Sequence, residues 1–169
     1  MDILSHGLWG AIVFGRKNKK SFWKSFLWGV MPDLLSFGIF TPLAFFGIVK
    51  SVNWHEGSPS PDQIPQFVHT LYNLTHSFVI FALVFGIVFY FTKKPMLEML
   101  AWPLHISVDI FTHGVGFFPT PFLWPFLAYR FDGIPWSHPS IFFTNWALLA
   151  VCYGLFFVYR KKNFSKNNK

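Results

Sequence analysis

The sequence predicts an all-α membrane protein: a multipass bundle of transmembrane helices with about five crossings, a short first helix and a broken second helix. Composition is the first reason, because 53% of the 169 residues are hydrophobic and only 12% are charged, whereas soluble domains carry about 25% charged residues. Charge placement is the second. The basic residues stand in short clusters between apolar stretches, at 16–20, 93–94 and 160–169, which is the pattern of cytoplasmic loops in membrane proteins.

The first part of the chain contains two apolar helical regions. Residues 2–15 are apolar but fall short of the roughly 20 residues that a full crossing takes. Residues 21–49 form a longer apolar stretch that contains Pro32. Because a proline inside a helix removes a backbone hydrogen bond, we expect this stretch to break into helices over about 21–32 and 34–49.

The middle of the chain predicts an external loop and two further helices. Residues 50–65 are polar and rich in turn-forming residues, and we expect them outside the bilayer. Residues 66–92 are the clearest single transmembrane helix, ended by two lysines and a proline. The next helix runs over about 96–113, and Pro103 is expected to bend it.

The last part of the chain predicts an interfacial segment and one more crossing. Residues 114–138 are rich in Gly, Pro and aromatic residues, which suits the membrane interface. Residues 140–159 form the last transmembrane helix. Residues 1–160 therefore make a single membrane-embedded helical domain, and the basic tail 161–169 is expected to be disordered.

The basic clusters also predict the orientation. Placing them on the cytoplasmic side gives a multipass protein of the cell membrane with its N-terminus outside and its C-terminus in the cytoplasm. Arg130 is the main charge left on the outside. The net charge of +7 does not indicate nucleic acid as a partner, because the cations form no continuous face.

The most informative residues are His105 and Asp109, an HxxxD pair inside an apolar stretch. Residues four apart on a helix share one face, and ionisable groups at membrane depth are costly and mark function by default. His6, Asp33 and His76 lie in apolar stretches too. At about 1.5 Å per residue, all five fall between the middle of the bilayer and its outer half. We expect them to meet.

Three imidazoles and two carboxylates form a donor set for a divalent transition metal. Zinc is the expected cofactor, with manganese or iron as alternatives. Cys152 is the only cysteine, which argues against a purely structural zinc site built from thiolates. Asp33 and Asp109 are the predicted catalytic groups: either one ion is held beside a spare carboxylate that acts as base, or two ions share an aspartate. Either arrangement lowers the pKa of bound water toward neutrality.

The order of these motifs resembles a known family. The motifs are Ser5-His6-Gly7, Gly29-Val30-Met31-Pro32-Asp33, Thr75-His76-Ser77 and His105-Ile106-Ser107-Val108-Asp109. Over roughly residues 5–113 they are similar to the YdjM-like membrane-bound metal-dependent hydrolases. The same order is similar to the soluble zinc-dependent phospholipases C, which are helical and cleave phosphoesters with a cluster of metal ions. The resemblance implies metal-site roles for the five residues and attack of water on a phosphorus ester.

One segment departs from the family pattern. The family usually has His-Arg a few residues before its Thr-His-Ser, where this chain has residues 71–74, Leu-Tyr-Asn-Leu. His69 precedes His76 by seven residues on the same helical face and could substitute. His113 follows Asp109 by four residues. It either adds a ligand, orients Asp109 through a contact with its carboxylate, or complements the end of its helix.

These observations predict an enzyme: a membrane-embedded metal-dependent hydrolase that cleaves a phosphoester of a lipid or lipid-linked substrate with metal-activated water. Arg130 is a candidate contact for the lipid headgroup. The alternatives are a transporter for a metal ion or proton, and a non-catalytic membrane scaffold. A purely structural role is the alternative for each residue: His76 and the HxxxD pair would be helix-packing groups, and Asp33 would be a helix cap.

Overall fold

The computed structural model describes residues 1–52 and 59–167, with side chains described as far as Tyr159, and every regular element in these residues is a helix. The predicted all-α class is confirmed. Residues 53–58 of the predicted external loop and residues 168–169 of the predicted tail lie outside the described residues. The elements are α1 (Ile3–Phe14), α2 (Lys19–Phe45), η2 (Pro61–Gln63), α3 (Gln66–Thr75), α4 (Phe78–Thr92), η3 (Leu97–Leu100), α5 (Ala101–Thr112) and α6 (Pro139–Asn167).

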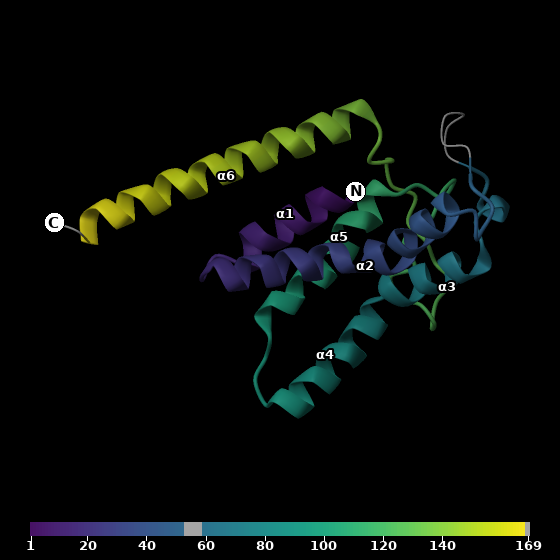
Figure 1. The fold of residues 1–169 in the computed structure, drawn as a ribbon, viewed down its shortest axis with the longest axis horizontal. Coiled ribbons are helices and arrows are strands. Elements are labelled where there is room, and N and C mark those ends of the chain that lie inside the picture. The colour runs from purple at the N-terminus through teal and green to yellow at the C-terminus, as the bar shows by residue number, and fades with distance from the viewer. Residues whose placement is uncertain (53–58, 168–169) are drawn as a thin grey trace.

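The long helix α2 is the central element of the fold. It contacts α1, α3, α5 and η3, and Figure 1 shows α1 lying along it at the middle of the molecule. The short helices α3 and α4 form a bent arm, and α6 packs against α1 and continues past its end toward the C-terminus. The chain therefore places α1, α2 and α5 together, with the bend between α3 and α4 beside them.

Within the described part of the chain, two helices are long and apolar enough to cross a membrane, α2 and the Pro139–Tyr159 part of α6. The pair α3 and α4 is a third candidate if the two helices, which are bent by 62°, form one broken span. This is fewer than the five crossings predicted. The reason is length: α1 and α5 have 12 residues each, or about 18 Å, against a hydrocarbon core of about 30 Å.

The predicted break of the second helix at Pro32 is wrong, because α2 is continuous from Lys19 to Phe45 with Pro32 and Pro42 inside it. A proline disturbs the backbone carbonyls of the preceding turn. In α2, side chains from other helices bond to carbonyls around the proline. His105 Nδ1 lies 2.7 Å from the carbonyl oxygen of Gly29, and Thr75 Oγ1 donates to that of Pro32 at 3.1 Å.

The break lies instead within the segment 66–92 that the sequence predicts as one helix. α3 ends at Thr75 and α4 begins at Phe78. Ser77 is the N-cap of α4, and its hydroxyl accepts hydrogen bonds from the amides of Val79 and Ile80 at 3.1 and 3.4 Å. A serine in this role satisfies amides at the start of a helix. The bend therefore has a local cause, and it sets His76 at the corner.

The next two boundaries also differ from those predicted. The segment 96–113 consists of η3 followed by α5. Pro103 lies in the first turn of α5, where the missing amide hydrogen costs little, so it does not bend a longer helix. The last helix extends through Asn167, past the predicted end at residue 159, and takes in most of the segment expected to be disordered.

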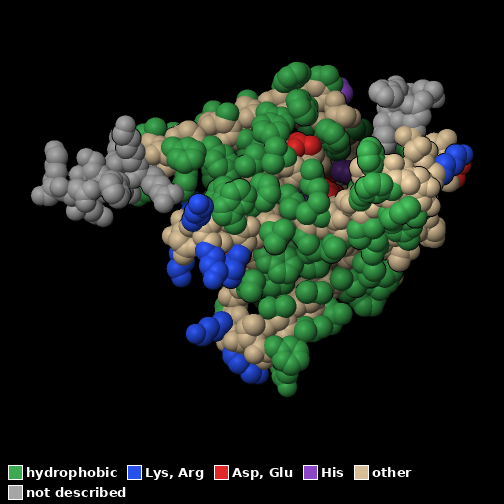
Figure 2. Space-filling view, in the orientation of Figure 1, with side chains coloured by type: hydrophobic (Ala, Val, Ile, Leu, Met, Phe, Trp, Pro, Cys, Tyr) green, Lys and Arg blue, Asp and Glu red, His purple; other side chains and the backbone are tan. Residues whose placement is uncertain are grey.

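Residues 114–138 contain no helix and cross over the bend between α3 and α4. The amide of Phe78 donates to the carbonyl of Phe122 at 3.0 Å, and Ser77 Oγ donates to that of Trp124. A small apolar core joins this segment to α2 and α3 and consists of Phe40, Ile64, Val68, Tyr72 and Phe118. Elsewhere large hydrophobic side chains cover much of the visible outer surface (Figure 2), as expected for a surface that faces lipid.

Candidate metal centre

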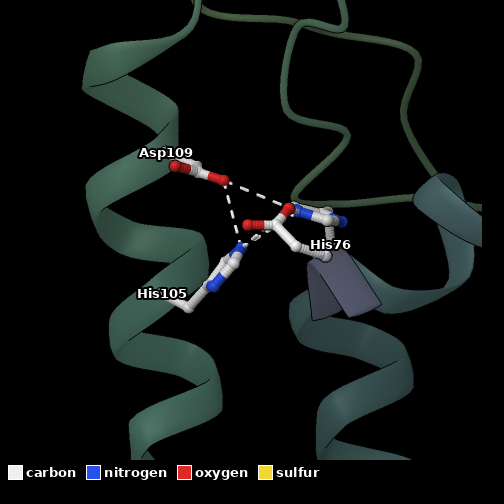
Figure 3. Close-up of side chains that lie close together, drawn as sticks. His76, His105 and Asp109 are labelled. Carbon is white, nitrogen blue, oxygen red and sulfur yellow. Dashed lines mark hydrogen bonds and ion pairs between the residues drawn. The ribbon is translucent and has the colours of Figure 1, made fainter. Parts of the chain in front are cut away.

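Three elements bring four metal-ligating side chains together. Asp33 lies in the middle of α2, His76 at the corner between α3 and α4, and His105 with Asp109 on one face of α5. One ligand atom from each lies within 4.8 Å of all the others, and Figure 3 shows His76, His105 and Asp109 pointing toward one another. His76, His105 and Asp109 are buried, and the side chain of Asp33 keeps 15% exposure. This group could hold a metal ion.

The distances within the group are short. Asp109 Oδ2 lies 3.1 Å from His105 Nε2 and 3.5 Å from His76 Nε2. Asp33 Oδ1 lies 3.5 Å from His76 Nε2 and 3.8 Å from His105 Nε2. The two Nε2 atoms are themselves 3.0 Å apart. Two nitrogens and two carboxylate oxygens therefore converge on one small volume.

The outer nitrogen of each imidazole faces a backbone carbonyl. His105 Nδ1 is 2.7 Å from the carbonyl oxygen of Gly29, and His76 Nδ1 is 3.1 Å from that of Tyr72. A carbonyl only accepts, so each Nδ1 carries the hydrogen. In a neutral imidazole this leaves the lone pair on Nε2, directed at the group. Metal-binding histidines commonly bond to a carbonyl through the other nitrogen in this way.

This arrangement favours a cation at the centre. Two Nε2 lone pairs facing each other at 3.0 Å repel unless a proton or a metal ion lies between them. Asp109 Oδ2 is buried and accepts no hydrogen bond from a described residue, although buried polar atoms are nearly always partnered. A divalent cation would bind the lone pairs and balance the two carboxylates, which removes much of the cost of burying them. The donor set fits such an ion.

The other oxygen of Asp109 faces a second set of groups. Asp109 Oδ1 is 2.9 Å from His6 Nε2 and 3.5 Å from His113 Nε2, and it forms an ion pair with the amino group of Met1. That amino group also lies 3.1 Å from Thr112 Oγ1 and 3.2 Å from His113 Nε2. The structure thus brings all five residues of the sequence prediction together, with Asp109 between two sets of imidazoles.

Close packing of α1 on α2 positions His6. A Cβ atom at Gly29 would lie 2.5 Å from the carbonyl oxygen of His6 and 3.1 Å from Cα of Gly7, so only glycine allows the two backbones to approach this closely. The ring of His6 stacks on that of His105 with centroids 3.6 Å apart. Asp2 caps α1 by accepting from the amide of Ser5 at 2.9 Å.

Polar contacts from α6 hold the same helix. Asn145 donates to Ser5 Oγ at 2.7 Å and accepts from Trp9 Nε1 at 2.8 Å. Tyr153 donates to the carbonyl of Leu8 at 2.9 Å. These bonds fix α1 along its length, and with it the side chain of His6.

Two of the candidate residues lie apart from the group. His69 Nε2 is 2.9 Å from the carbonyl oxygen of Pro61, and its ring stacks on Phe118 with centroids 4.6 Å apart. Arg130 donates to the carbonyl of Tyr129 at 3.2 Å. Partial burial lowers the pKa of Arg130 from its usual value, and the nearby Tyr72 acts in the opposite direction. Their proposed roles stay predictions.

Tyr72 is a residue of the site that the sequence analysis treated only as part of a departure. Its ring stacks on His76 with centroids 3.8 Å apart, and its hydroxyl donates to the carbonyl of Phe118 at 2.9 Å. Trp102 was also missed, and its Nε1 donates to the carbonyl of Thr75 at 2.6 Å. The spacing offered one signal: Tyr72 and His76 are four residues apart, so they share a face of a helix.

The outer surface gives access to acidic and histidine side chains. Figure 2 shows Asp or Glu atoms and a His side chain in a hollow ringed by hydrophobic side chains.

Comparisons of the chain with models of protein families, with curated proteins and with solved structures found no match. The geometry of the group and the order of the motifs that form it are therefore the features that bear on function.

Proposed function

We propose that the protein is a membrane-embedded metal-dependent hydrolase that cleaves a phosphoester of a lipid or lipid-linked substrate. The observation that carries the proposal is the pair of Nε2 atoms 3.0 Å apart, each with its Nδ1 at a carbonyl, between two carboxylates. The order of the motifs, similar to that of the YdjM-like hydrolases and the phospholipases C, supports phosphoester chemistry over other hydrolyses.

Each residue has a proposed role under this assignment. His76, His105, Asp33 and Asp109 hold the cation, for which zinc is our choice and manganese or iron the alternatives. When bound, such an ion lowers the pKa of water toward neutrality and polarises a phosphoryl oxygen. Asp33 keeps 15% of its side chain exposed, so it is the carboxylate best placed to accept a proton from an incoming water.

The residues around Asp109 serve to position it. His6 and His113 face its Oδ1 at 2.9 and 3.5 Å, and so leave Oδ2 directed at His76 and His105. In the alternative with two ions, Asp109 would be the shared aspartate and His6 would help to hold the second ion. Buried neighbours such as Ile106 and Trp102 keep bulk water away from the group, which strengthens every charge interaction inside it.

A lipid substrate follows from the surroundings of the site. The helices that carry the group are apolar, and large hydrophobic side chains are exposed around them. We propose that α2, α6 and the bent pair α3–α4 cross the cell membrane, with α1 and α5 inserted beside them. The basic clusters then lie on the cytoplasmic side, the N-terminus outside, and the metal centre toward the outer leaflet with Arg130 near the headgroups.

The test uses purified full-length protein in detergent. Elemental analysis measures bound metal, and turnover is measured on a phospholipid and on a lipid phosphate. We expect metal at a fixed ratio to protein and release of the phosphoester product. Asp109→Asn should lose at least about tenfold in metal affinity and all detectable turnover. Asp132→Asn is the matched control, because Asp132 is exposed in a loop and its side-chain hydrogen bond among the described residues is from the amide of Val115 at 2.9 Å.

The alternatives give different results in the same preparation. A transporter would move metal ions or protons into liposomes and release no product from either lipid. A scaffold would neither transport ions nor release product, and His105→Ala would leave it intact. Equal metal content in Asp109→Asn and the unchanged protein would refute the assignment of Asp109.

A further inference from the structure

A second feature of the molecule lies away from the metal centre, between α1 and α6. The two helices are joined by the hydrogen bonds of Asn145 and Tyr153 to α1, and α6 continues past the end of α1 (Figure 1). A groove of about 610 Å³ lies between residues of the two helices. This volume is within the range of sites that hold a small organic ligand.

The walls of the groove are apolar and its far end is cationic. Ile12 and Val13 line it from α1, and Leu155 and Phe156 line it from α6. Arg16 and Lys17 follow the end of α1 and close the same groove. Figure 2 shows Lys and Arg side chains gathered along the edge of the molecule where α2 begins and α4 ends.

The cations at this end are largely uncompensated. Among the described residues, neither Arg16 nor Lys17 forms a salt bridge, and the groove is lined by no carboxylate. Glu98 is the acidic group whose charge reaches Lys17. Its partial burial would raise its pKa, but hydrogen bonds, one of them from Ser21, and the charges of Lys24 and Lys17 hold that pKa below its usual value.

We propose that this groove binds a phospholipid with a net negative headgroup, with an acyl chain along the apolar walls and the phosphate at Arg16 and Lys17. Basic pockets between transmembrane helices bind anionic headgroups in this way. A free phosphate would leave the apolar walls empty. A zwitterionic lipid would find no described acidic side chain in the groove for its ammonium group.

The site is independent of the proposed hydrolysis. His6 lies near the start of α1, and Arg16 and Lys17 follow its end. Arg16 is ten positions after His6 in the chain, which corresponds to about 15 Å along a helix. A lipid held there would hold α1 and α6 together beyond the point where Tyr153 joins them. It is therefore a bound structural lipid, and not the substrate.

Native mass spectrometry of the detergent-solubilised full chain tests the proposal by titration with phosphatidylglycerol and with phosphatidylcholine. We expect the protein to bind phosphatidylglycerol about thirtyfold more tightly, as two cations near a headgroup predict. The double variant Arg16→Gln/Lys17→Gln should lose this preference. The matched control, Lys93→Gln/Lys94→Gln, removes two exposed cations outside the groove and should keep it. Loss of the preference in both would overturn the proposal in favour of general surface charge.

Three further measurements test where the lipid binds and what part of it is recognised. Val13→Trp fills the groove without changing charge, and should weaken binding of phosphatidylglycerol as strongly as the charge variant does. Cys152 lines the groove and is the only cysteine, so a fluorophore on it should be quenched by phosphatidylglycerol with brominated acyl chains. Inorganic phosphate added to the protein–lipid complex should not displace the bound phosphatidylglycerol. An unquenched fluorophore, tight binding by Val13→Trp, or displacement by phosphate would each contradict the assignment.

Discussion

At the scale of single residues, Asp109 has a different set of partners at each carboxylate oxygen. Oδ2 faces His105 and His76, and Oδ1 faces His6 and His113. His113 Nδ1 is itself 3.0 Å from the carbonyl oxygen of Phe118. A histidine bonded on one side to a carbonyl and directed on the other at a ligand is suited to orient that ligand.

We therefore expect His113→Gln to lower metal affinity by about 10–100-fold, the usual cost of losing a group that orients a ligand. Metal titration followed by elemental analysis measures this, and at saturating metal the variant should bind as many ions as the unchanged protein. His138→Gln is the control, because His138 lies exposed in a loop and contacts Ser140. Unchanged affinity in His113→Gln would show that His113 only ends its helix.

At the scale of helices, two local features shape the site: the corner at Ser77 and the contact at Gly29. The hydroxyl of Ser77 both caps α4 and donates to the carbonyl of Trp124. Gly29 allows the backbones of α1 and α2 to touch. The corner at Ser77 sets the direction in which the chain leaves His76. The contact at Gly29 sets how closely His6 approaches α2.

Ser77→Ala should destabilise the corner by about 0.5–2 kcal/mol, the usual cost of losing a serine cap. It should also weaken metal binding, because His76 is the preceding residue. Thermal unfolding in detergent and metal titration measure the two effects. Ser36→Ala is the control: its hydroxyl bonds to the Pro32 carbonyl of its own helix at 3.1 Å, where alanine is a good replacement. Equal effects of the two substitutions would argue against the cap.

Gly29→Ala should lower stability by about 1–3 kcal/mol, as overpacking does, because the atoms that the new methyl group meets belong to the backbone of α1. Metal affinity should fall with it, since His6 moves. Gly86→Ala is the matched control within α4, where a Cβ meets nothing within 4 Å and alanine favours the helix by about 0.5–1 kcal/mol. An unfolding temperature unchanged by Gly29→Ala would disprove the close approach.

At the scale of the whole molecule, α2, the corner of α3–α4 and α5 meet at one buried group of charges. A ligand that binds the folded state stabilises it, by about 2.7 kcal/mol when its concentration is a hundredfold above its Kd. Removal of the metal by a chelator should then lower the unfolding temperature by about 5–10 °C for a chain of this length. Differential scanning fluorimetry measures the change.

Asp109→Asn provides the control for chelation, because a protein that has lost its metal site has no ion to give up. Its unfolding temperature should be the same with and without chelator. Restoring metal to the chelated unchanged protein should recover its unfolding temperature. A chelator that lowers both proteins equally would act through the detergent or the membrane-facing surface, and would contradict a role for metal in stability.

Much of the site could be predicted from the sequence because its chemistry is rare in apolar helices. The spacing of His105 and Asp109 and the apolar setting of His6, Asp33 and His76 were enough to expect that they meet. Tyr72 escaped notice because a tyrosine in an apolar helix is ordinary, and only its stacking on His76 distinguishes it.

The helix boundaries were less predictable because tertiary contacts decide them. Pro32 is the strongest local signal for a break, yet hydrogen bonds from His105 and Thr75 to carbonyls near it accompany an unbroken α2. The break occurs at Ser77, where the cap and the carbonyl of Trp124 act together. The number of crossings was overestimated because apolar composition does not distinguish a helix that spans lipid from a short one such as α5.

The wide separation in sequence of the four clustered side chains has a consequence for biosynthesis. Asp33 and His76 leave the ribosome before His105 and Asp109, and at about 5–20 residues per second the wait is a few seconds. During that time Asp33 and His76 lack the partners that α5 supplies. An ion that needs all four side chains could therefore bind only after α5 has been synthesised.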